Sequence, residues 1–217
     1  YKSISDETSV EEALSAILSH HFQNAQRKRR ALNLPSPTNT MYRLVNGEGD
    51  SLSGLQIDVI DTHIVVQSSA AWCETHKDII VKVLEQVTDC ETIVWKVAQS
   101  RLKQDGYRGV IKDEDEEEDS TAVLALENGV TFQTFPGLGG QKTGVYCDQR
   151  ENRNTLAHYT QGKTVLDLCC FHGGFGLTAV QQGGATSAVG VDSSAAAISA
   201  AQTNAQLNDC QDKVSFV

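Results

Sequence analysis

The stretch of residues 163–176 (KTVLDLCCFHGGFG) constrains the fold more than any other part of the chain. Its apolar start is typical of a short buried β-strand, and the closely spaced glycines that follow indicate a tight turn into a helix. Residues 188–192 (AVGVD) then predict a second buried strand that ends on an acidic residue. A glycine turn after one strand and an acid at the end of the next are typical of nucleotide-type α/β sheets.

The details of this turn favour a methyl donor over a dinucleotide. A dinucleotide site has the pattern G-x-G-x-x-G, which seats a pyrophosphate on a helix N-terminus. Here Asp167 stands at the strand end, and the nearby glycines are Gly173, Gly174 and Gly176. S-adenosylmethionine has no phosphate, and its sulfonium and ammonium groups are positive, so an acidic strand end suits it. We therefore expect S-adenosylmethionine as the cofactor, with a dinucleotide oxidoreductase as a distant alternative.

Composition sets the outer limits of the fold. A chain of 217 residues with 40% hydrophobic residues can bury one or two ordinary cores. No apolar run is long enough to span a membrane, and the N-terminus lacks a signal-peptide pattern. The six cysteines contain no C-x-x-C pair, which favours reduced thiols over a disulfide framework or a zinc site. We expect a cytoplasmic protein, with an organelle matrix or stroma as the alternative.

The formal net charge of −10 is unevenly distributed. Seven acids stand together in residues 113–119 (DEDEEED), and setting them aside leaves −3. Such a block is typical of a solvated insertion, and we expect it to form a mobile loop without chemistry. The opposite charge gathers in Arg27, Lys28, Arg29 and Arg30. This basic cluster is either the polar end of an exposed helix or a contact for nucleic-acid phosphates.

The first 40 residues predict one long helix and a linker. Residues 9–12 (SVEE) have the pattern of a capping box, with a hydroxyl at the cap and a carboxylate three residues later. Apolar residues then recur at helical spacing. We expect the helix to end near Leu32, before Pro35 and Pro37.

Residues 41–140 predict a small central α+β domain. Asn128 and Gly129 lie between two alternating segments and indicate a two-residue hairpin turn. Glu48 and Asp50 lie in a glycine-rich loop, and we expect them to form its turns. The expected strands cover residues 42–46, 55–60, 63–67, 92–97, 122–127 and 130–135, and the expected helix covers 74–87.

Residues 141–217 predict an alternation of strands and helices. The expected strands cover residues 164–168, 187–191 and 214–217, and the expected helices cover 149–159, 174–182 and 195–207. Short connections between alternating elements argue for a parallel sheet with right-handed crossovers. The chain is thus predicted to be α/β, with the central domain followed by the first half of a Rossmann-like sheet.

Three stretches together resemble one enzyme family. They are residues 42–58 (YRLVNGEGDSLSGLQID), residues 139–153 (GGQKTGVYCDQRENR), and the turn at 167–176 with the acid at Asp192. From about Ser9 to Val217, the chain resembles the class I S-adenosylmethionine-dependent methyltransferases of the large-subunit ribosomal RNA methyltransferase I type. These enzymes place a methyl group on carbon 5 of a cytosine. The GQKTG-x-Y-x-DQR element is far more specific than the glycine turn.

The resemblance implies which residues bind the donor. Asp167 and the turn at Gly173 and Gly174 would face its methionine end, and Asp192 would accept hydrogen bonds from both ribose hydroxyls. The segment before the first strand of the sheet would fold over the cofactor. The expected set is Tyr146, Asp148, Gln149, Asp167, Phe171, Gly173, Gly174, Phe175, Asp192 and Ser193. For Phe175, packing in the core is an equal alternative.

The resemblance also implies ribosomal RNA as the partner. Lys142 and Arg150 would contact a phosphate or the target base, and the alternative for both is an ion pair with Asp148 or Glu151. The four residues of the basic cluster are further candidates for RNA contact. A homodimer is left open.

The chain departs from the family pattern where catalytic residues are expected. The family's Asp-Pro-Pro-type motif and its later nucleophilic cysteine do not occur, so no catalytic nucleophile is assigned. Family members usually begin with an RNA-binding domain of the PUA type, which lies before the region matched here. We expect the natural chain to continue beyond Val217, and the strand at 164–168 to take its second neighbour from those later residues.

Two other functions stay open from the sequence. One is a methyltransferase of the same fold that acts on another base, a protein or a small molecule. The other is a donor-binding or RNA-binding fragment without catalysis.

Overall fold

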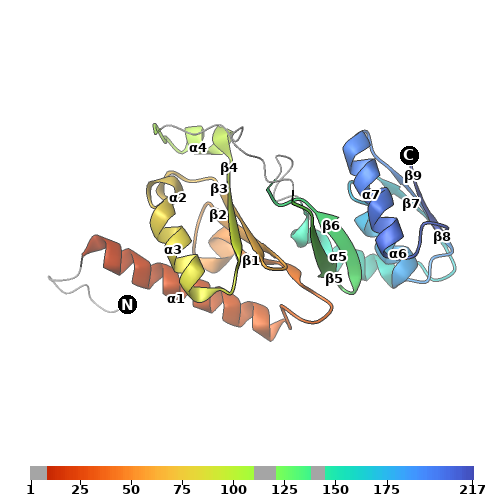
Figure 1. The fold of residues 1–217 in the computed structure, drawn as a ribbon, viewed down its shortest axis with the longest axis horizontal. Coiled ribbons are helices and arrows are strands. Elements are labelled where there is room, and N and C mark those ends of the chain that lie inside the picture. The colour runs from red at the N-terminus through yellow and green to blue at the C-terminus, as the bar shows by residue number, and fades with distance from the viewer. Residues whose placement is uncertain (1–8, 110–120, 138–144) are drawn as a thin grey trace. The chain divides into compact units, whose positions relative to one another are not determined.

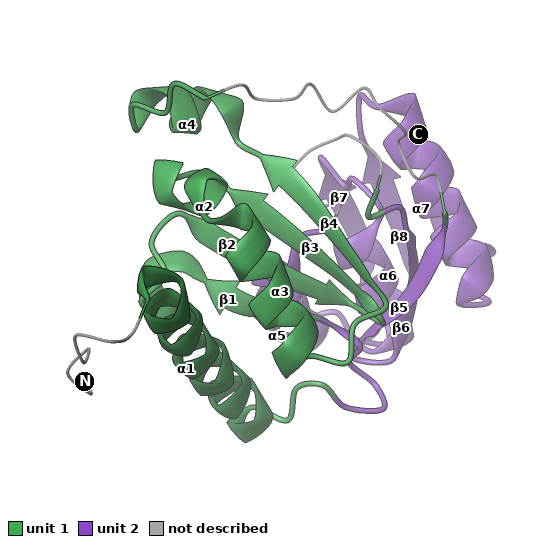
Figure 2. Cartoon of the chain, turned by 60° about the vertical axis from the view of Figure 1, so that its left-hand side comes forward, with its two compact units in different colours: residues 1–35, 42–121, 136–144 green, residues 36–41, 122–135, 145–217 purple. Residues whose placement is uncertain are grey.

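The computed structural model describes residues 9–109, 121–137 and 145–217, which form two compact units (Figures 1 and 2). Unit 1 contains residues 1–35, 42–121 and 136–144, and unit 2 contains residues 36–41, 122–135 and 145–217. The acidic run at 113–119 and Lys142 lie outside the described residues.

Unit 1 is built on one four-stranded sheet with helices on one of its faces (Figure 2). The strands, in spatial order, are β1 (Met41–Asn46), β2 (Leu55–Ile60), β3 (His63–Ser68) and β4 (Thr92–Val97). Strands β2 and β3 are antiparallel, as expected for a hairpin, whereas β3 and β4 are parallel. The parallel pair is joined by the helices α2 (Ala71–Thr75) and α3 (Lys77–Val87).

The helix α1 (Val10–Ala31) starts with the predicted capping box. The Ser9 hydroxyl accepts the Glu12 N–H at 3.2 Å, and the Glu12 carboxylate accepts the Ser9 N–H at 3.0 Å. The buried face of the helix includes Leu18 and Phe22, which join a core formed with α3 and the sheet. Full burial of such a side chain contributes about 1.5–3 kcal/mol relative to leaving it exposed.

The structure differs from the sequence prediction at three places in unit 1. The helix expected at 74–87 is two helices, α2 and α3, because His76 between them leaves helical geometry with φ −118° and ψ 23°. The short helix α4 (Gln99–Gln104) was not expected. The glycine-rich loop contains the 3₁₀ turn η1 (Gly47–Asp50), after which Ser51 takes a left-handed conformation.

Unit 2 contains a three-stranded parallel sheet in the order β7-β8-β9. Its elements are η2 (Cys147–Gln149), α5 (Arg150–Ala157), β7 (Thr164–Leu168), α6 (Gly174–Gln181), β8 (Ser187–Val191), α7 (Ala195–Leu207) and β9 (Val214–Phe216). This alternation of strands and helices confirms the predicted α/β class.

The strand β7 lies at an edge of this sheet. Within the described part of the chain it pairs only with β8. Leu166 and Leu168 on β7 keep 64% and 65% of their surfaces exposed. No helix in the described ranges is long and apolar enough to cross a membrane.

A hairpin of β5 (Val123–Glu127) and β6 (Val130–Thr134) also belongs to unit 2. Its turn has positive φ at both Asn128 (49°) and Gly129 (81°), as the predicted two-residue turn requires. Asn204 of α7 and Asn208, the residue directly after this helix, accept the N–H groups of Gln133 and Thr131, each at 2.8 Å. The sequence assigned this hairpin to the domain at 41–140, whereas these long-range bonds attach it to α7.

Candidate functional site

The turn between β7 and α6 is held in an unusual backbone conformation. Cys169, Phe171 and Gly173 all have positive φ angles, of 60°, 49° and 79°. At Gly173 an added Cβ would lie 2.5 Å from the ring of Phe216, so this position requires glycine for space as well as for conformation. The two non-glycine residues are in a sparsely populated region, which is common where a ligand is bound.

Asp192, directly after β8, fixes this turn. Its Oδ2 accepts the N–H of Phe171, and its Oδ1 accepts the N–H of Ser194, both at 2.9 Å. The bond from Ser194 and then the bond from Phe171 hold the pKa of the Asp192 carboxyl below its ordinary value. The side chain is only partly buried, and its remaining lone pairs are available to a ligand with hydroxyl groups.

Asp167 lies at the same ends of the strands but is buried. Its Oδ2 accepts the N–H of Gly176, in the first turn of α6, at 3.1 Å. Burial raises the pKa of this carboxyl, and the Gly176 bond and the charge of Arg153 only partly offset that effect. A cationic ligand group beside Asp167 would stabilise its charged form.

Aromatic rings from two segments meet at the turn. The rings of Tyr146 and Phe171 pack edge to face, with centroids 5.1 Å apart and planes at 87°. The Phe171 ring also stacks on His172, with centroids 3.7 Å apart. Burial lowers the pKa of His172 to about 4, so this imidazole is neutral at pH 7. The contact brings the segment before α5 to the glycine turn.

Arg153 of α5 is a residue of this region that the sequence did not single out. It is 7% exposed, and its guanidinium donates to both carboxylate oxygens of Glu127, at 2.6 and 2.7 Å. It also donates to the Tyr146 carbonyl at 2.9 Å, and its Cζ lies 5.7 Å from the centre of the Phe175 ring. The available signal was its place at the end of the stretch 139–153, three residues after the GQKTG-x-Y-x-DQR element ends at Arg150.

Several of the predicted donor-binding residues lie at this turn, and the others are next to them in the sequence. Ser193 is exposed directly after Asp192. Asp148 and Gln149 lie in η2, next to Tyr146, where Gln149 Oε1 accepts a bond from the Asn152 amide at 2.9 Å. Arg150 donates from Nε to Glu151 at 3.0 Å, which is the ion pair that the sequence left as the alternative to RNA contact.

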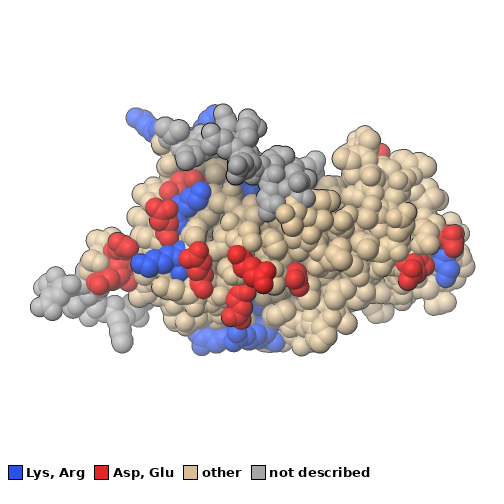
Figure 3. Space-filling view, in the orientation of Figure 1, with Lys and Arg blue, Asp and Glu red and all other residues tan. Residues whose placement is uncertain are grey.

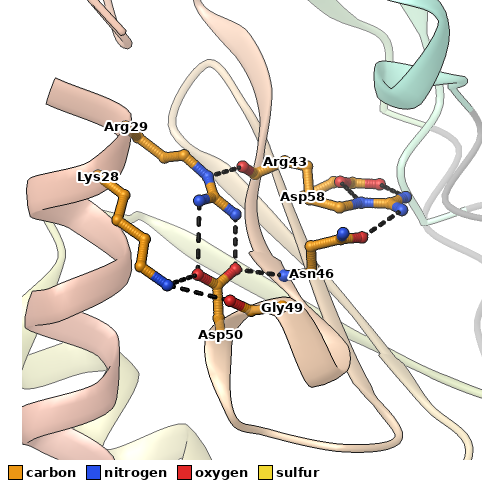
Figure 4. Close-up of polar contacts among 7 residues, drawn as sticks. All are labelled: Lys28, Arg29, Arg43, Asn46, Gly49, Asp50 and Asp58. Atoms are coloured by element: carbon orange, nitrogen blue, oxygen red, sulfur yellow. Dashed lines mark hydrogen bonds and ion pairs between the residues drawn. The ribbon is translucent and has the colours of Figure 1, made fainter. Parts of the chain in front are cut away.

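The basic cluster lies in unit 1, in the last turns of α1. Lys and Arg side chains gather at the lower edge of Figure 3, where these turns lie. Asp50 forms ion pairs with two members of the cluster (Figure 4). Lys28 Nζ lies 3.0 Å from its Oδ1, and Arg29 donates to its Oδ2 at 2.6 Å. Arg27 and Arg30 are exposed, and Arg27 donates to the nearby Asn24 side chain.

Figure 4 shows how Asp50 and Asp58 tie the end of α1 to the sheet. Besides its two cations, Asp50 accepts the N–H of Asn46 at 2.8 Å, while Arg29 Nε donates to the carbonyl of Arg43 at 2.8 Å. The Arg43 guanidinium in turn donates to both oxygens of the buried Asp58, at 2.9 and 3.1 Å. Asp50 is therefore more than a turn former, because its one carboxylate pairs with both Lys28 and Arg29.

Comparisons with known proteins match both a family model and whole relatives. The family model of ribosomal protein L11 methyltransferase (PrmA) matches residues 107–217. Ribosomal RNA large subunit methyltransferase I of Aeromonas hydrophila is 38% identical over 172 residues, which are 78% of this chain and 42% of that protein. The chain spans less than half the length of the curated relatives it matches.

Two solved structures extend the likeness to the whole fold. A Streptococcus mutans protein described as an S-adenosylmethionine-dependent methyltransferase is 25% identical and superposes with a TM-score of 0.77, covering 98% of this chain and 53% of its own. A methyltransferase structure complexed with SAH gives the same identity of 25%, TM-score of 0.77 and coverages of 98% and 53%. The chain belongs to the family of S-adenosylmethionine-dependent methyltransferases that includes ribosomal RNA large subunit methyltransferase I.

Proposed function

We propose that this chain binds S-adenosylmethionine and serves in the methylation of large-subunit ribosomal RNA, with carbon 5 of a cytosine as the target. The observation that carries the proposal is the pairing of Asp192 with the Phe171 N–H at the carboxyl ends of β7 and β8. Ligands of open α/β sheets bind at these strand ends. The names of the relatives supply the RNA substrate class.

The chemistry of the site suits this donor. Asp192 is held ionised and would accept hydrogen bonds from the two ribose hydroxyls, with Ser193 close to the adenine. Asp167, whose pKa is raised by burial, would gain a cationic partner from the methionine ammonium or the sulfonium. The turn at Gly173 and Gly174 would face the methionine end of the donor, and the space that a Cβ would need at these positions is taken by the Phe216 ring and by Arg153.

The remaining predicted residues surround the same position. Tyr146 and Phe171 would pack on the donor, with Phe175 either beside it or in the core. Asp148 and Gln149 would cover it from the segment before α5. When bound, the donor supplies a methyl group activated by its sulfonium, while these residues bind and orient it.

The residues that would contact RNA are basic side chains outside the glycine turn that binds the donor. Arg27 and Arg30 are the members of the basic cluster that Asp50 does not hold, and they would contact phosphates. Lys142 and Arg150 remain candidates for contact near the methyl group. The expected compartment is the one that holds the target ribosomes, which is the cytoplasm or an organelle matrix or stroma.

The test uses the full-length protein, unmodified large-subunit ribosomal RNA and a donor labelled in its methyl group. We expect labelled 5-methylcytidine after digestion of the RNA to nucleosides. If the label is found on another nucleoside, the target is that nucleoside and not carbon 5 of a cytosine. Donor binding in calorimetry without any methyl transfer would favour the second candidate, a donor-binding protein without catalysis. Binding of NAD in place of adenosylhomocysteine would contradict both.

A further inference from the structure

The buried guanidinium of Arg153 connects three segments of unit 2. It donates to Glu127 at the end of β5, to the carbonyl of Tyr146 before α5, and it lies against the first turn of α6. At Gly174 an added Cβ would lie 3.1 Å from Arg153 Cδ and 3.4 Å from its Nη1. The lack of a side chain at Gly174 therefore lets this arginine reach the donor turn.

The ion pair of Glu127 and Arg153 is not needed to attach the β5–β6 hairpin to the rest of unit 2. The β5–β6 hairpin is already bonded to α7 and the residue after it, through hydrogen bonds between the side-chain amides of Asn204 and Asn208 and the backbone of β6. A buried ion pair is a weak source of stability, because desolvation of the two charges offsets much of their attraction. A planar guanidinium held by both oxygens of one carboxylate instead has a fixed orientation.

That orientation aims the third bond of Arg153 at Tyr146. The two bonds to Glu127 use Nε and Nη2, and Nη2 also donates to the Tyr146 carbonyl at 2.9 Å. The Tyr146 ring then meets Phe171, whose N–H is bound by Asp192. Contacts thus run without a break from Glu127 to the residue at the ribose end of the site.

We propose that Arg153 is a positioning residue for donor binding, which holds Tyr146 against the glycine turn, and that Glu127 sets the orientation of its guanidinium. The inference rests on the proposed function of this site. It assigns the β5–β6 hairpin a role as the support of the donor site. Arg153 contributes to donor binding by holding Tyr146 and the turn in place, and it does not touch the reacting atoms.

The test measures the affinity of the full-length protein for adenosylhomocysteine by calorimetry, together with the melting temperature of each variant. Arg153→Lys keeps a positive charge beside Glu127 but loses the planar fork that serves Glu127 and Tyr146 together. The double variant Glu127→Leu/Arg153→Met removes both buried charges, a change that is often neutral for stability. Asn208→Ala is the control, because it loosens the hairpin without touching Tyr146 or the turn.

We expect Arg153→Lys and the double variant to bind adenosylhomocysteine about tenfold more weakly, the effect of one lost charged hydrogen bond, at melting temperatures close to or above that of Asn208→Ala. Asn208→Ala should bind within about twofold of the wild type. If Arg153→Lys and any folded double variant bind as tightly as the wild type, the positioning role is wrong. The same conclusion follows if affinity falls equally in Asn208→Ala. A wild type that does not bind adenosylhomocysteine overturns the proposed function itself.

Discussion

The side chain of Asp192 and the backbone N–H of Phe171 are joined by a hydrogen bond of 2.9 Å, although 21 residues separate them in the chain. The bond connects the end of β8 to the turn that follows β7. It holds Phe171 at φ 49°, where its ring can meet both Tyr146 and His172. One carboxylate thus organises the turn and also remains accessible to a ligand.

Replacement of this carboxylate should weaken donor binding. We expect Asp192→Ala to cost about 1.5–3 kcal/mol of binding free energy for adenosylhomocysteine, the range for a hydrogen bond to a charged group. Calorimetry on the full-length protein measures this directly. Asp212→Ala removes an exposed acid of the same unit and should bind like the wild type. Equal affinities for Asp192→Ala and the wild type would remove Asp192 from the site.

The neutral His172 should make stability depend on pH. Burial lowers its pKa from 6.5 to about 4, so the unfolded chain binds a proton between these values and the folded chain does not. The stability that the neutral His172 contributes is therefore fully present above pH 6.5 and is lost as the pH decreases toward 4. The loss from this residue is of the order of 3 kcal/mol at most, because each pKa unit is worth 1.36 kcal/mol.

The variant His172→Phe separates this effect from the other titrations, because it keeps a ring against Phe171. Denaturant titrations followed by circular dichroism between pH 7 and 4.5 should show a shallower decline than in the wild type. His158→Gln, which replaces an exposed imidazole of unit 2, serves as the control and should leave the slope unchanged. Parallel curves for wild type and His172→Phe would show that His172 does not carry the pH dependence.

Features set by neighbouring residues could be predicted from the sequence. The glycine turn, the capping box of α1 and the Asn128-Gly129 hairpin each depend on residue types within a few positions. Asp167 and Asp192 could be identified because one lies at the end of a predicted strand and the other directly after the next, although the burial predicted for the first strand was wrong: β7 is an edge strand with Leu166 and Leu168 exposed. In these cases the local pattern and the tertiary structure favour the same conformation.

Pairs far apart in the sequence could not be predicted. Glu127 and Arg153 are 26 residues apart, and nothing in either local pattern shows that the two charges are buried together. In the same way, nothing in the local pattern at the end of α7 shows that Asn204 and Asn208 bind the backbone of β6. Which members of the basic cluster are ion-paired also depends on a distant residue, Asp50, which follows Arg29 by 21 residues.

Loss of the Asp50 carboxylate should strongly destabilise unit 1, because it leaves a mostly buried cation without its partner. Asp50→Ala leaves the guanidinium of Arg29, whose side chain is 14% exposed, without its carboxylate. Breaking a buried pair in this way costs about 3–5 kcal/mol. Burial alone would raise the pKa of Asp50, but the bonds from Asn46, Lys28 and Arg29 bring it below the ordinary value. The ionised Asp50 therefore contributes stability above the ordinary pKa of an aspartate. This stability is lost as the pH falls through the lower pKa that Asp50 has in the folded chain.

Tryptophan fluorescence is the appropriate probe for this variant, since Trp72 and Trp95 both lie in unit 1. Denaturant midpoints should be much lower for Asp50→Ala than for the wild type. Glu48→Ala, which removes the neighbouring acid and its bond to Ser53, should have a far smaller effect. A midpoint for Asp50→Ala as high as that of Glu48→Ala would show that the network in Figure 4 adds little stability.

The exposed half of the basic cluster should contribute to RNA affinity through phosphates. Arg27→Ala/Arg30→Ala removes two cations that carry no ion pair among the described residues. Each phosphate contact contributes about 0.7–0.9 to the slope of log affinity against log salt concentration. We therefore expect the slope for ribosomal RNA fragments to fall by about 1.4–1.8 in this double variant, with equal loss across sequences.

The comparison with Lys28→Ala makes this prediction specific to the pairing seen in the structure. Lys28 binds Asp50 and the carbonyl of Gly49, so less of its charge is available to a phosphate, and its replacement should change the slope by much less than one. Lys82→Ala/Lys163→Ala removes two exposed cations elsewhere and corrects for the change in net charge. Filter binding across a series of salt concentrations gives all three slopes. If the Arg27/Arg30 slope equals that of the Lys82/Lys163 control, RNA does not contact the end of α1, and the cluster is only the polar end of a helix.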